Sequence, residues 1–467
     1  MRTAAAGLIG LALALPGLAM AQARPDQQAF RAIYQELVET NTTLSAGSCT
    51  EAAAKMGARL KSAGFADADI TYFADPAKPK EGGVVAILKG SDPKAGAVLL
   101  LGHLDVVEAR REDWTRDPFK LIEEGGYFYA RGTADMKSID AIWVDTLMRL
   151  RAVKTPPKRT LKLALTCGEE TNEAFNGAAW LANNRPDLVS ADFGLNEGGG
   201  GRLGPDGQRE VLSIQMGEKA SQNFLLEVTN PGGHSSRPTP DNAIYHLANA
   251  LVKIQGYIFP VKMTDTTRGG FELRAQRGDP AGNGLKALLA NPADAAAQKA
   301  AETDVSINSI LHTNCVATRL DAGHASNALP QRATAIVNCR IFPGETWQQT
   351  RDTLARVMGD PKVRVTPMTP DKPIASPPPL DPKVVEPMKA VAAKHFPGVP
   401  LIPAMSSGAS DALYFGPVKL AIYGVPGIFG DPDGGGVHGL NERLRVASLY
   451  DGRDYLFDLV KAYVGAK

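Results

Sequence analysis

The chain has 467 residues, of which 44% are hydrophobic and 22% are charged, and its net charge is +1. This length favours two domains over one, and the composition is ordinary for a globular protein. The near-zero net charge and the lack of any lysine or arginine block argue against nucleic acid or an anionic membrane as a partner.

The N-terminus is predicted to be an export signal. Arg2 precedes an apolar run over residues 4–18, which Ala19-Met20-Ala21 follows. A basic start, a short apolar stretch and an A-x-A-like site are typical of a cleaved signal peptide, although a buried helix is an alternative. The run is too short to favour a membrane span. We therefore assign residues 1–23 to a signal peptide and expect a periplasmic or secreted protein.

Export permits disulfide bonds between the four cysteines. Cys315 and Cys339 could pair if their strands are neighbours, which the sequence does not decide. Cys167 ends an apolar strand pattern and is expected to be a buried thiol. The absence of a CxxC motif argues against a thiolate zinc site.

The first part of the chain alternates short apolar runs with helical patterns. Helices are expected near residues 26–37, 51–63, 139–150 and 174–182, and strands near 84–88, 98–101 and 161–165. This alternation predicts an α/β domain with a central, mostly parallel sheet.

The pattern changes near Gly217 and indicates an inserted α+β domain over residues 217–369. Strands are expected at 224–228, 307–311, 333–342 and 363–365, with helices at 243–252 and 346–358. Residues 264–303 are interpreted as an insertion with one helix near 284–289. The proline-rich segment 371–382 is predicted to be a linker back to the first domain, which then comprises residues 24–216 and 370–467.

Residues of metal-ligand type follow the apolar runs of the first domain. They are His103 and Asp105 after 98–101, Asp135 after 127–129, Glu169 and Glu170 after 161–165, Glu197 after 193–195, and His438 in a late segment that continues to Glu442. Each alone has a structural explanation, such as a turn, a helix cap or a solvated surface pair. Because ligands bind beyond the carboxyl ends of strands in open α/β sheets, we expect these groups to converge.

Several carboxylates in one cleft repel each other unless a cation is present. Histidine with carboxylate, and no thiolate, suits zinc, cobalt or manganese. Asp105 is expected to accept the second ring N–H of His103. Glu169 and Glu170 point to different sides of an extended segment, so one can bind metal while the other acts as a general base.

Five segments, taken in order, resemble the motifs of the M20 metallopeptidases over most of the chain, from about Leu37 to Leu444. They are 102–107, 131–137, 168–170, 196–198 and 437–439. The resemblance implies a catalytic α/β domain that binds two zinc ions per subunit, with cobalt or manganese as alternatives. His103 and Glu197 would hold one ion, Glu170 and His438 the other, and Asp135 would bridge them. Glu169 would be the general base.

The same resemblance implies that residues 217–369 form a lid or dimerisation domain, and it raises the expectation of a homodimer. His234, in a Gly-His-Ser segment, would reach the oxyanion, often in the partner's site. Arg340 would receive the substrate carboxylate, and Asn327 and Gly408 match positions near the substrate. Ser138 stands where many members have glycine, and the loop after Asp411 lacks a frequent arginine. These departures concern the substrate pocket.

Two reactions fit this set of residues. The first is cleavage of a small peptide beside its free carboxylate, as in a carboxypeptidase or dipeptidase. The alternative is hydrolysis of an N-acyl amino acid, which would use the same metals and base. A solute-binding protein would also have two lobes but gives no reason for adjacent Glu169 and Glu170. A serine hydrolase lacks support, because no GxSxG lies at a strand–helix turn.

Overall fold

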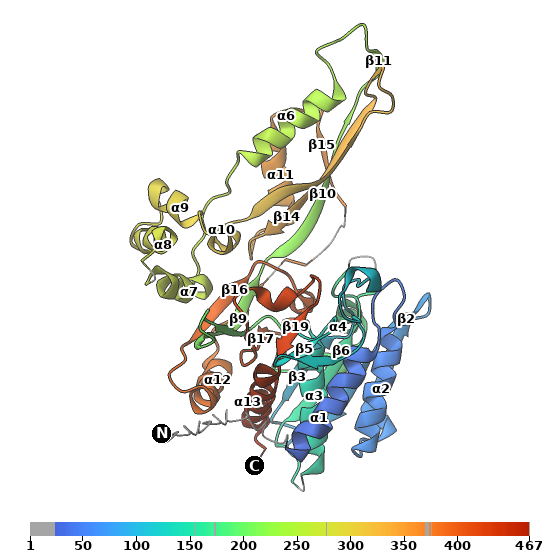
Figure 1. Ribbon diagram of the computed structural model, residues 1–467, viewed down its shortest axis with the longest axis vertical. Coiled ribbons are helices and arrows are strands. Elements are labelled where there is room, and N and C mark those ends of the chain that lie inside the picture. Colours follow the sequence, from blue (N-terminus) through green and yellow to red (C-terminus); the bar gives the residue numbers. More distant parts are fainter. Residues whose placement is uncertain are drawn as a thin grey trace, which may run out of the picture.

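The computed structural model describes residues 24–466 except 154, 172–173, 277, 369–372 and 375. The predicted signal peptide and part of the predicted linker lie outside these described residues. Among the helices that are described, none has the length and apolar character needed to cross a membrane. Figure 1 shows two bodies, a larger one that contains both ends of the described chain and a smaller one that stands above it.

The larger body, expected above to be the catalytic domain, is built on a mixed sheet of ten strands in the order β1-β2-β6-β3-β7-β17-β9-β8-β18, with β16 paired to β9. Its central strands β6, β3, β7 and β17 are parallel to one another. The strands are β1 (Ile70–Asp75), β2 (Lys78–Leu88), β3 (Ala97–His103), β6 (Thr160–Thr166), β7 (Phe193–Asn196), β8 (Gly200–Leu203), β9 (Arg209–Glu218), β16 (Leu401–Ser406), β17 (Ile422–Gly424) and β18 (Phe429–Gly430).

Helices cover both faces of this sheet, as the sequence of β3 requires. Val98 and Leu100 belong to one buried cluster, whereas Leu99 and Leu101 belong to another, because successive strand residues point to opposite faces. The first cluster includes α1 (Pro25–Glu39), α2 (Cys49–Ser62), α3 (Lys137–Ala152), α12 (Pro382–His395) and α13 (Val446–Val464). The second includes α4 (Gly177–Asn184) and α5 (Pro186–Val189). The sheet is therefore buried on both sides, which leaves its strand ends for function.

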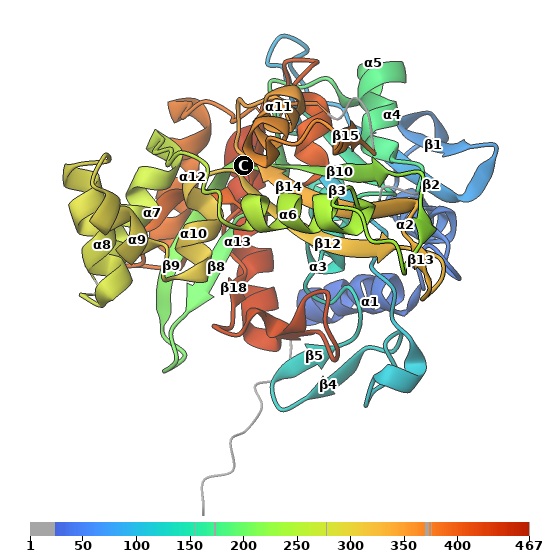
Figure 2. The same cartoon turned by 90° about the horizontal axis from the view of Figure 1, so that it is seen from above.

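The smaller body, the lid, is an antiparallel sheet of four strands in the order β12-β14-β10-β15. Every second residue of β14 is buried, and these residues share a core with α6 and α11. Figure 2 shows both helices over this sheet. Its elements are β10 (Ala220–Thr229), α6 (Ala243–Gln255), β12 (Asn314–Ala322), β14 (Arg332–Ile341), α11 (Trp347–Met358) and β15 (Arg364–Pro367). A short pair, β11 (Gly233–His234) with β13 (Ala328–Leu329), extends from it. The α/β fold with a separate antiparallel domain is thus as predicted.

The insertion in the lid differs from the prediction. Residues 264–303 form three helices, not one: α7 (Asp265–Ala275), α8 (Pro280–Ala290) and α9 (Ala295–Ala301). With the following α10 (Val305–Leu311) they pack around a small core of their own. The strand expected at 307–311 is wrong, because these residues form α10. The Asp304 side chain accepts hydrogen bonds from the backbone N–H groups of Ser306 and Ile307. A short apolar run has no decisive period, and this N-cap determines the helix.

Three further strands form a separate small sheet, β4 (Ile122–Glu124), β5 (Tyr127–Tyr129) and β19 (Arg443–Arg445). Single 3-10 turns lie at Asp67–Asp69, Arg111–Asp113, Asp411–Phe415 and Gly434–Gly436. The small sheet brings the chain after β5 and the chain before β19 together, and both carry predicted metal ligands.

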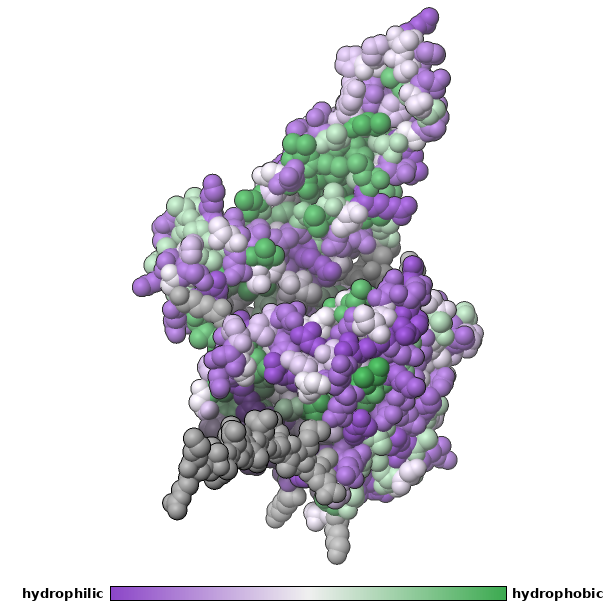
Figure 3. All heavy atoms as spheres, viewed as in Figure 1, coloured by the Kyte–Doolittle hydropathy of each residue, from purple (hydrophilic) through white to green (hydrophobic). Residues whose placement is uncertain are grey.

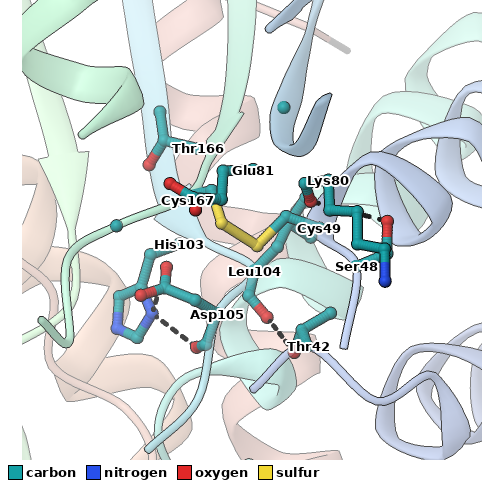
Figure 4. The surroundings of a disulfide bond; sticks show 12 residues. Thr42, Ser48, Cys49, Lys80, Glu81, His103, Leu104, Asp105, Thr166 and Cys167 are labelled. Carbon is teal, nitrogen blue, oxygen red and sulfur yellow. Dashed lines mark hydrogen bonds and ion pairs between the residues drawn. A yellow bond between two sulfur atoms is a disulfide. The ribbon is translucent and has the colours of Figure 1, made fainter. Parts of the chain in front are cut away.

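All four cysteines are paired. Cys315 and Cys339 face each other across β12 and β14 and form a disulfide. The expectation of a buried thiol at Cys167 is wrong, since Cys167 is bonded to Cys49 at the start of α2. Figure 4 shows this disulfide beside Leu104 and Asp105. It ties α2 to the strand end that carries Glu169 and Glu170.

The Cys49–Cys167 bond closes a loop of 118 residues and the Cys315–Cys339 bond one of 24. We expect the Cys49→Ala/Cys167→Ala protein to lose about 2–5 kcal/mol of stability, and to lose roughly 1–1.5 kcal/mol more than Cys315→Ala/Cys339→Ala, because the longer loop restricts the unfolded chain more. Urea denaturation followed by circular dichroism measures both. A larger loss for the lid pair would contradict this reasoning.

Candidate metal centre

Three neighbouring parallel strands deliver four of the predicted site residues to one edge of the sheet. His103 is the last residue of β3 and is paired with Thr166, the last residue of β6. Glu169 and Glu170 follow β6, and Glu197 follows β7 directly. Since β3 lies between β6 and β7, these side chains must meet.

Asp135 reaches the centre by a different route from the one predicted. The run 127–129 is β5 of the small sheet, not a strand of the central sheet. The segment after it is held by the buried carboxylate of Glu442, which accepts hydrogen bonds from Arg131 Nη1 at 2.7 Å and from the backbone nitrogens of Gly132, Ala134 and Asp135 at 3.0, 2.8 and 3.2 Å. Glu442 is therefore a positioning residue for Asp135, a role that the sequence did not reveal.

His438 lies in a turn with a backbone φ of 60° and comes from the segment that Glu442 also belongs to. Its side chain is 53% exposed, whereas that of His103 is 2% exposed. His103 therefore contacts the carboxylates from the buried interior of the domain, whereas His438 contacts them from the solvent-exposed surface.

The carboxylate of Asp135 lies between the two imidazoles. Its Oδ1 is 3.4 Å from Nε2 of His103, and its Oδ2 is 3.2 Å from Nε2 of His438. Each imidazole has a second carboxylate beside it: Glu197 Oε1 is 3.5 Å from His103 Nε2, and Glu170 Oε2 is 2.9 Å from His438 Nε2. The five predicted ligands thus form two groups that share Asp135.

These spacings fit metal ligation. Two ligand atoms about 2.0–2.2 Å from a tetrahedral zinc lie roughly 3.3–3.6 Å from each other. The distances around His103 fall in this range, and buried His103 Nε2 makes no hydrogen bond. A polar nitrogen buried without a partner is costly unless a ligand occupies it. His103, Asp135 and Glu170 each offer a ligand atom within 4.8 Å of the others, as do His103, Glu169 and Glu197.

The electrostatics also favour a cation. Burial disfavours charge on His103, yet the carboxylates of Glu197 and Asp135 hold its pKa well above the ordinary value. Hydrogen bonds to Asp135 and Glu170 raise the pKa of His438 to about 10. Burial raises the pKa of Glu197 to about 7. The protein therefore concentrates negative charge here, and this charge favours protonation of the imidazoles. Bound metal ions would replace these protons.

Asp105 positions both His103 and Glu170, but it contacts His103 through a different group from the one predicted. The Nδ1 of His103 hydrogen-bonds the main-chain carbonyl of Asp105 at 3.0 Å, while the carboxylate Oδ1 is 3.7 Å away. The other carboxylate oxygen accepts from the backbone N–H of Glu170 at 3.0 Å. The carbonyl thus fixes the imidazole tautomer, and the carboxylate fixes the backbone of Glu170.

Glu169 and Glu170 have different neighbours, although they lie in a bend after β6 and not in the extended segment expected. Glu169 lies with His103 and Glu197, and Glu170 lies with His438. Burial raises the pKa of Glu169 well above its ordinary value, and the charges of Glu197, Asp411 and Glu170 add to this effect. A carboxylate with a raised pKa beside the centre has the property that a general base needs.

Asp411 fastens both ends of the loop that carries Glu169 and Glu170, a role that the sequence did not reveal. Thr166 Oγ1 contacts Asp411 Oδ2 at 2.9 Å, before the loop, and Asn176 Nδ2 donates to Asp411 Oδ1 at 2.8 Å, after it. Asn176 also caps α4 and donates to the carbonyl of Gly168 at 3.0 Å. A buried acid between two apolar strand patterns gives no sequence signal for such a contact.

The lid residues divide into two groups. Arg340 lies on the face of β14 opposite the buried cluster, where it interacts with the charge of Glu169, and burial lowers its pKa. Gly408 accepts a hydrogen bond from the backbone of Lys219 at 3.1 Å, between the two bodies.

His234 and Asn327 lie together at the short β11–β13 pair, where the backbone N–H of Ser235 donates a hydrogen bond to the carbonyl of Asn327 at 3.1 Å. Figure 1 places β11 at the end of the lid far from the catalytic domain, so the structure does not bring these two to the metal centre of their own chain.

The fold and this centre define a metal-dependent hydrolase with an α/β catalytic domain and an antiparallel lid. Residues 99–462 match the sequence profile of peptidase family M20/M25/M40, and the chain belongs to this family.

Curated relatives match most of the chain. The N-fatty-acyl-amino acid synthase/hydrolase PM20D1 of Homo sapiens is 28% identical over 383 residues, which cover 80% of this chain and 75% of that protein. A probable carboxypeptidase S-like 2 of Dictyostelium discoideum is 26% identical over 386 residues, 80% of this chain and 73% of that protein. The crystal structure of the M20 family metallo-carboxypeptidase Sso-CP2 from Sulfolobus solfataricus superposes with a TM-score of 0.70 at 19% identity, covering 94% of this chain and 99% of that one. The last comparison supports the fold.

We expect Asp411→Ala to lower kcat by about 10–100-fold, because releasing both ends of the loop displaces Glu169 and Glu170 from their working positions. Asp411→Asn is the matched control. Its amide oxygen can still accept from Asn176 and its NH₂ can donate to Thr166, so it should stay within about fivefold of the wild type. Steady-state kinetics on metal-loaded proteins make the comparison, and equal losses in both variants would refute the tether.

Metal binding should release protons. In the metal-free protein the pKa of His438 is raised to about 10, and nearby carboxylates raise the pKa of His103 as well, so the site favours the imidazolium form of both side chains. A metal must displace these protons, so about two or more should be released per chain at pH 7, and metal affinity should rise with pH and fall as the pH is lowered. Calorimetric titration with zinc in two buffers of different ionisation enthalpy measures the release. Binding without proton release would contradict the ligand assignment.

Proposed function

We propose that the protein is a two-zinc hydrolase that cleaves an amide bond beside a free carboxylate, in the manner of a carboxypeptidase or dipeptidase. The observation that carries the proposal is the carboxylate of Asp135, whose two oxygens face two different imidazoles, each with its own second carboxylate. Histidine and carboxylate ligands suit zinc, with cobalt or manganese as alternatives.

Metal ions held by these residues would polarise the substrate carbonyl and lower the pKa of water to about 7. The chain's own groups account for the rest of the reaction. Glu169, with its raised pKa, is placed to take a proton from the attacking water and to return it to the departing nitrogen. Arg340 faces Glu169 from the lid, and its guanidinium is suited to a substrate carboxylate.

Hydrolysis of N-acyl amino acids is a second candidate. It is favoured by the similarity to PM20D1, whose name describes action on N-fatty-acyl-amino acids. Both reactions need the same metals, base and carboxylate receptor, and they differ in the group on the acyl side of the bond.

Export to the periplasm or the exterior is part of the proposal. Its support is the basic and apolar N-terminus together with the two disulfides, Cys49–Cys167 and Cys315–Cys339, because disulfides persist in oxidising compartments.

Replacing Glu169 with Gln should lower kcat by at least about 10²–10⁴-fold while the protein keeps two metal equivalents, because the amide cannot accept the proton. The matched variant Glu170→Gln should lose metal as well as activity, since Glu170 is assigned as a ligand. Kinetics paired with metal analysis separate the two roles. Wild-type turnover by Glu169→Gln would end the assignment of the base.

We further propose that two chains pair through their lids. Among the residues that the structure describes, strand β12 pairs on one side only, with β14. Its Val316 and Leu320 are 60% and 64% exposed, and Tyr245 and Val252 of α6 are 61% and 66% exposed. Figure 3 shows apolar side chains gathered on this part of the lid. An open strand edge beside an apolar helix is typical of an interface, and pairing would give His234 and Asn327 a role in the partner's site.

Mixing inactive variants tests that arrangement. His234→Ala and Glu169→Gln should each be nearly inactive alone. If His234 serves the partner's site, a mixed dimer has one complete site, so random exchange should restore about one quarter of wild-type activity. Activity measurements before and after subunit exchange show the result. No recovery in proven mixed dimers would exclude a role for His234 across the interface.

A further inference from the structure

A pocket of about 360 Å³ opens directly beside the metal centre, within the catalytic domain. Two assigned metal ligands, Asp135 and Glu197, form part of its lining, and so does Val437, the neighbour of His438. A second pocket, of about 310 Å³, is lined by Asp105 and Cys167 but by none of the assigned metal ligands. A group attached to the carbonyl at the centre can therefore enter the first pocket without crossing other residues.

The inner walls of this pocket are apolar. They combine buried side chains with bare glycine backbone, contributed by Ala134, Met136, Ile139, Ile428, Phe429 and Leu444 and by the glycines at 198–201, 434 and 435. Gly434 has a φ of +76°, and a Cβ there would meet nothing within 4 Å. Gly434 thus leaves room that a side chain would fill, and the other walls are apolar, as suits a hydrocarbon group.

The charged residues of the pocket are already paired with each other. Asp431 accepts from Arg445 Nε at 2.6 Å and lies 3.6 Å from Arg443 Nη2, and Arg443 also contacts Asp433 at 2.7 Å. The side chain of Asp431 is only 7% exposed. Within the described lining, Asp135 and Glu197 are the other carboxylates, and both are assigned to metal. The ammonium group of a dipeptide would therefore enter an apolar space in which no described acid is free to receive it, at a high cost in desolvation.

We infer that this pocket binds the uncharged, apolar acyl chain of an N-acyl amino acid, with the carboxylate end held from the lid side by Arg340. The inference rests on the proposed two-metal amide hydrolysis, and of its two candidate substrate classes it selects the N-acyl amino acids. Burying a methylene in such a pocket strengthens transition-state binding, so kcat/KM should rise about threefold to fourfold for each added methylene until the pocket is full.

The test uses the full-length metal-loaded enzyme with N-acetyl-, N-butanoyl-, N-octanoyl- and N-dodecanoyl-leucine and with the dipeptide Ala-Leu. Val437→Trp, at a position 41% exposed, should narrow the pocket, so its loss on N-dodecanoyl-leucine should exceed its loss on N-acetyl-leucine by at least tenfold. Ile428→Ala should enlarge the pocket and move the optimum to longer chains. The matched control is Val418→Trp, at a position 42% exposed and outside the pocket, which should leave all rates unchanged.

A flat dependence on chain length in the wild type, or equal losses on long and short chains in Val437→Trp with its metal retained, would overturn the inference. Faster cleavage of Ala-Leu than of every acyl-leucine would also overturn it, while leaving the amide hydrolase intact. Failure to cleave any of these amides, with two metals bound, would instead contradict the proposed function itself.

Discussion

The structure depends on one electrostatic constraint. The carboxylate of Asp135 stands between His103 and His438, and Glu170, Glu197 and Glu169 surround it. So many acidic groups at one sheet edge repel each other. The carboxylates raise the pKa values of both imidazoles, and burial raises the pKa of Glu197, so this edge favours bound positive charge. Two divalent cations would neutralise this charge. We therefore expect metal binding to stabilise the folded arrangement of this sheet edge.

Much of the catalytic domain holds these groups in place without touching substrate. Glu442 gathers the backbone N–H groups of the segment that ends at Asp135, Asp411 joins the two ends of the Glu169–Glu170 loop, and Asp105 fixes both His103 and the backbone of Glu170. Each uses a buried carboxylate or carbonyl that accepts hydrogen bonds from the element it positions. Such contacts keep ligand atoms within a few tenths of an ångström of the geometry that a metal requires.

The sequence predicted which side chains meet at this edge because strand ends leave little freedom. A histidine that ends a buried parallel strand, and acids that follow the strands on either side, must share one edge once the strands pair as β6-β3-β7. Asp135 was predicted correctly as a neighbour but for the wrong reason, since it comes from a small separate sheet through Glu442. The contacts of Glu442 and Asp411 join residues more than 200 positions apart, and no local pattern encodes them. The same limit explains Cys167, whose partner Cys49 lies on a distant helix, and residues 307–311, where the Asp304 cap decided between strand and helix.

The most direct test of the account is a crystal structure of the zinc-loaded protein with anomalous data collected at the zinc edge. The account predicts two anomalous peaks per chain, about 3.5–4 Å apart, with Asp135 between them, His103 and Glu197 on one and Glu170 and His438 on the other. A single peak, or two peaks that do not share Asp135, would contradict it.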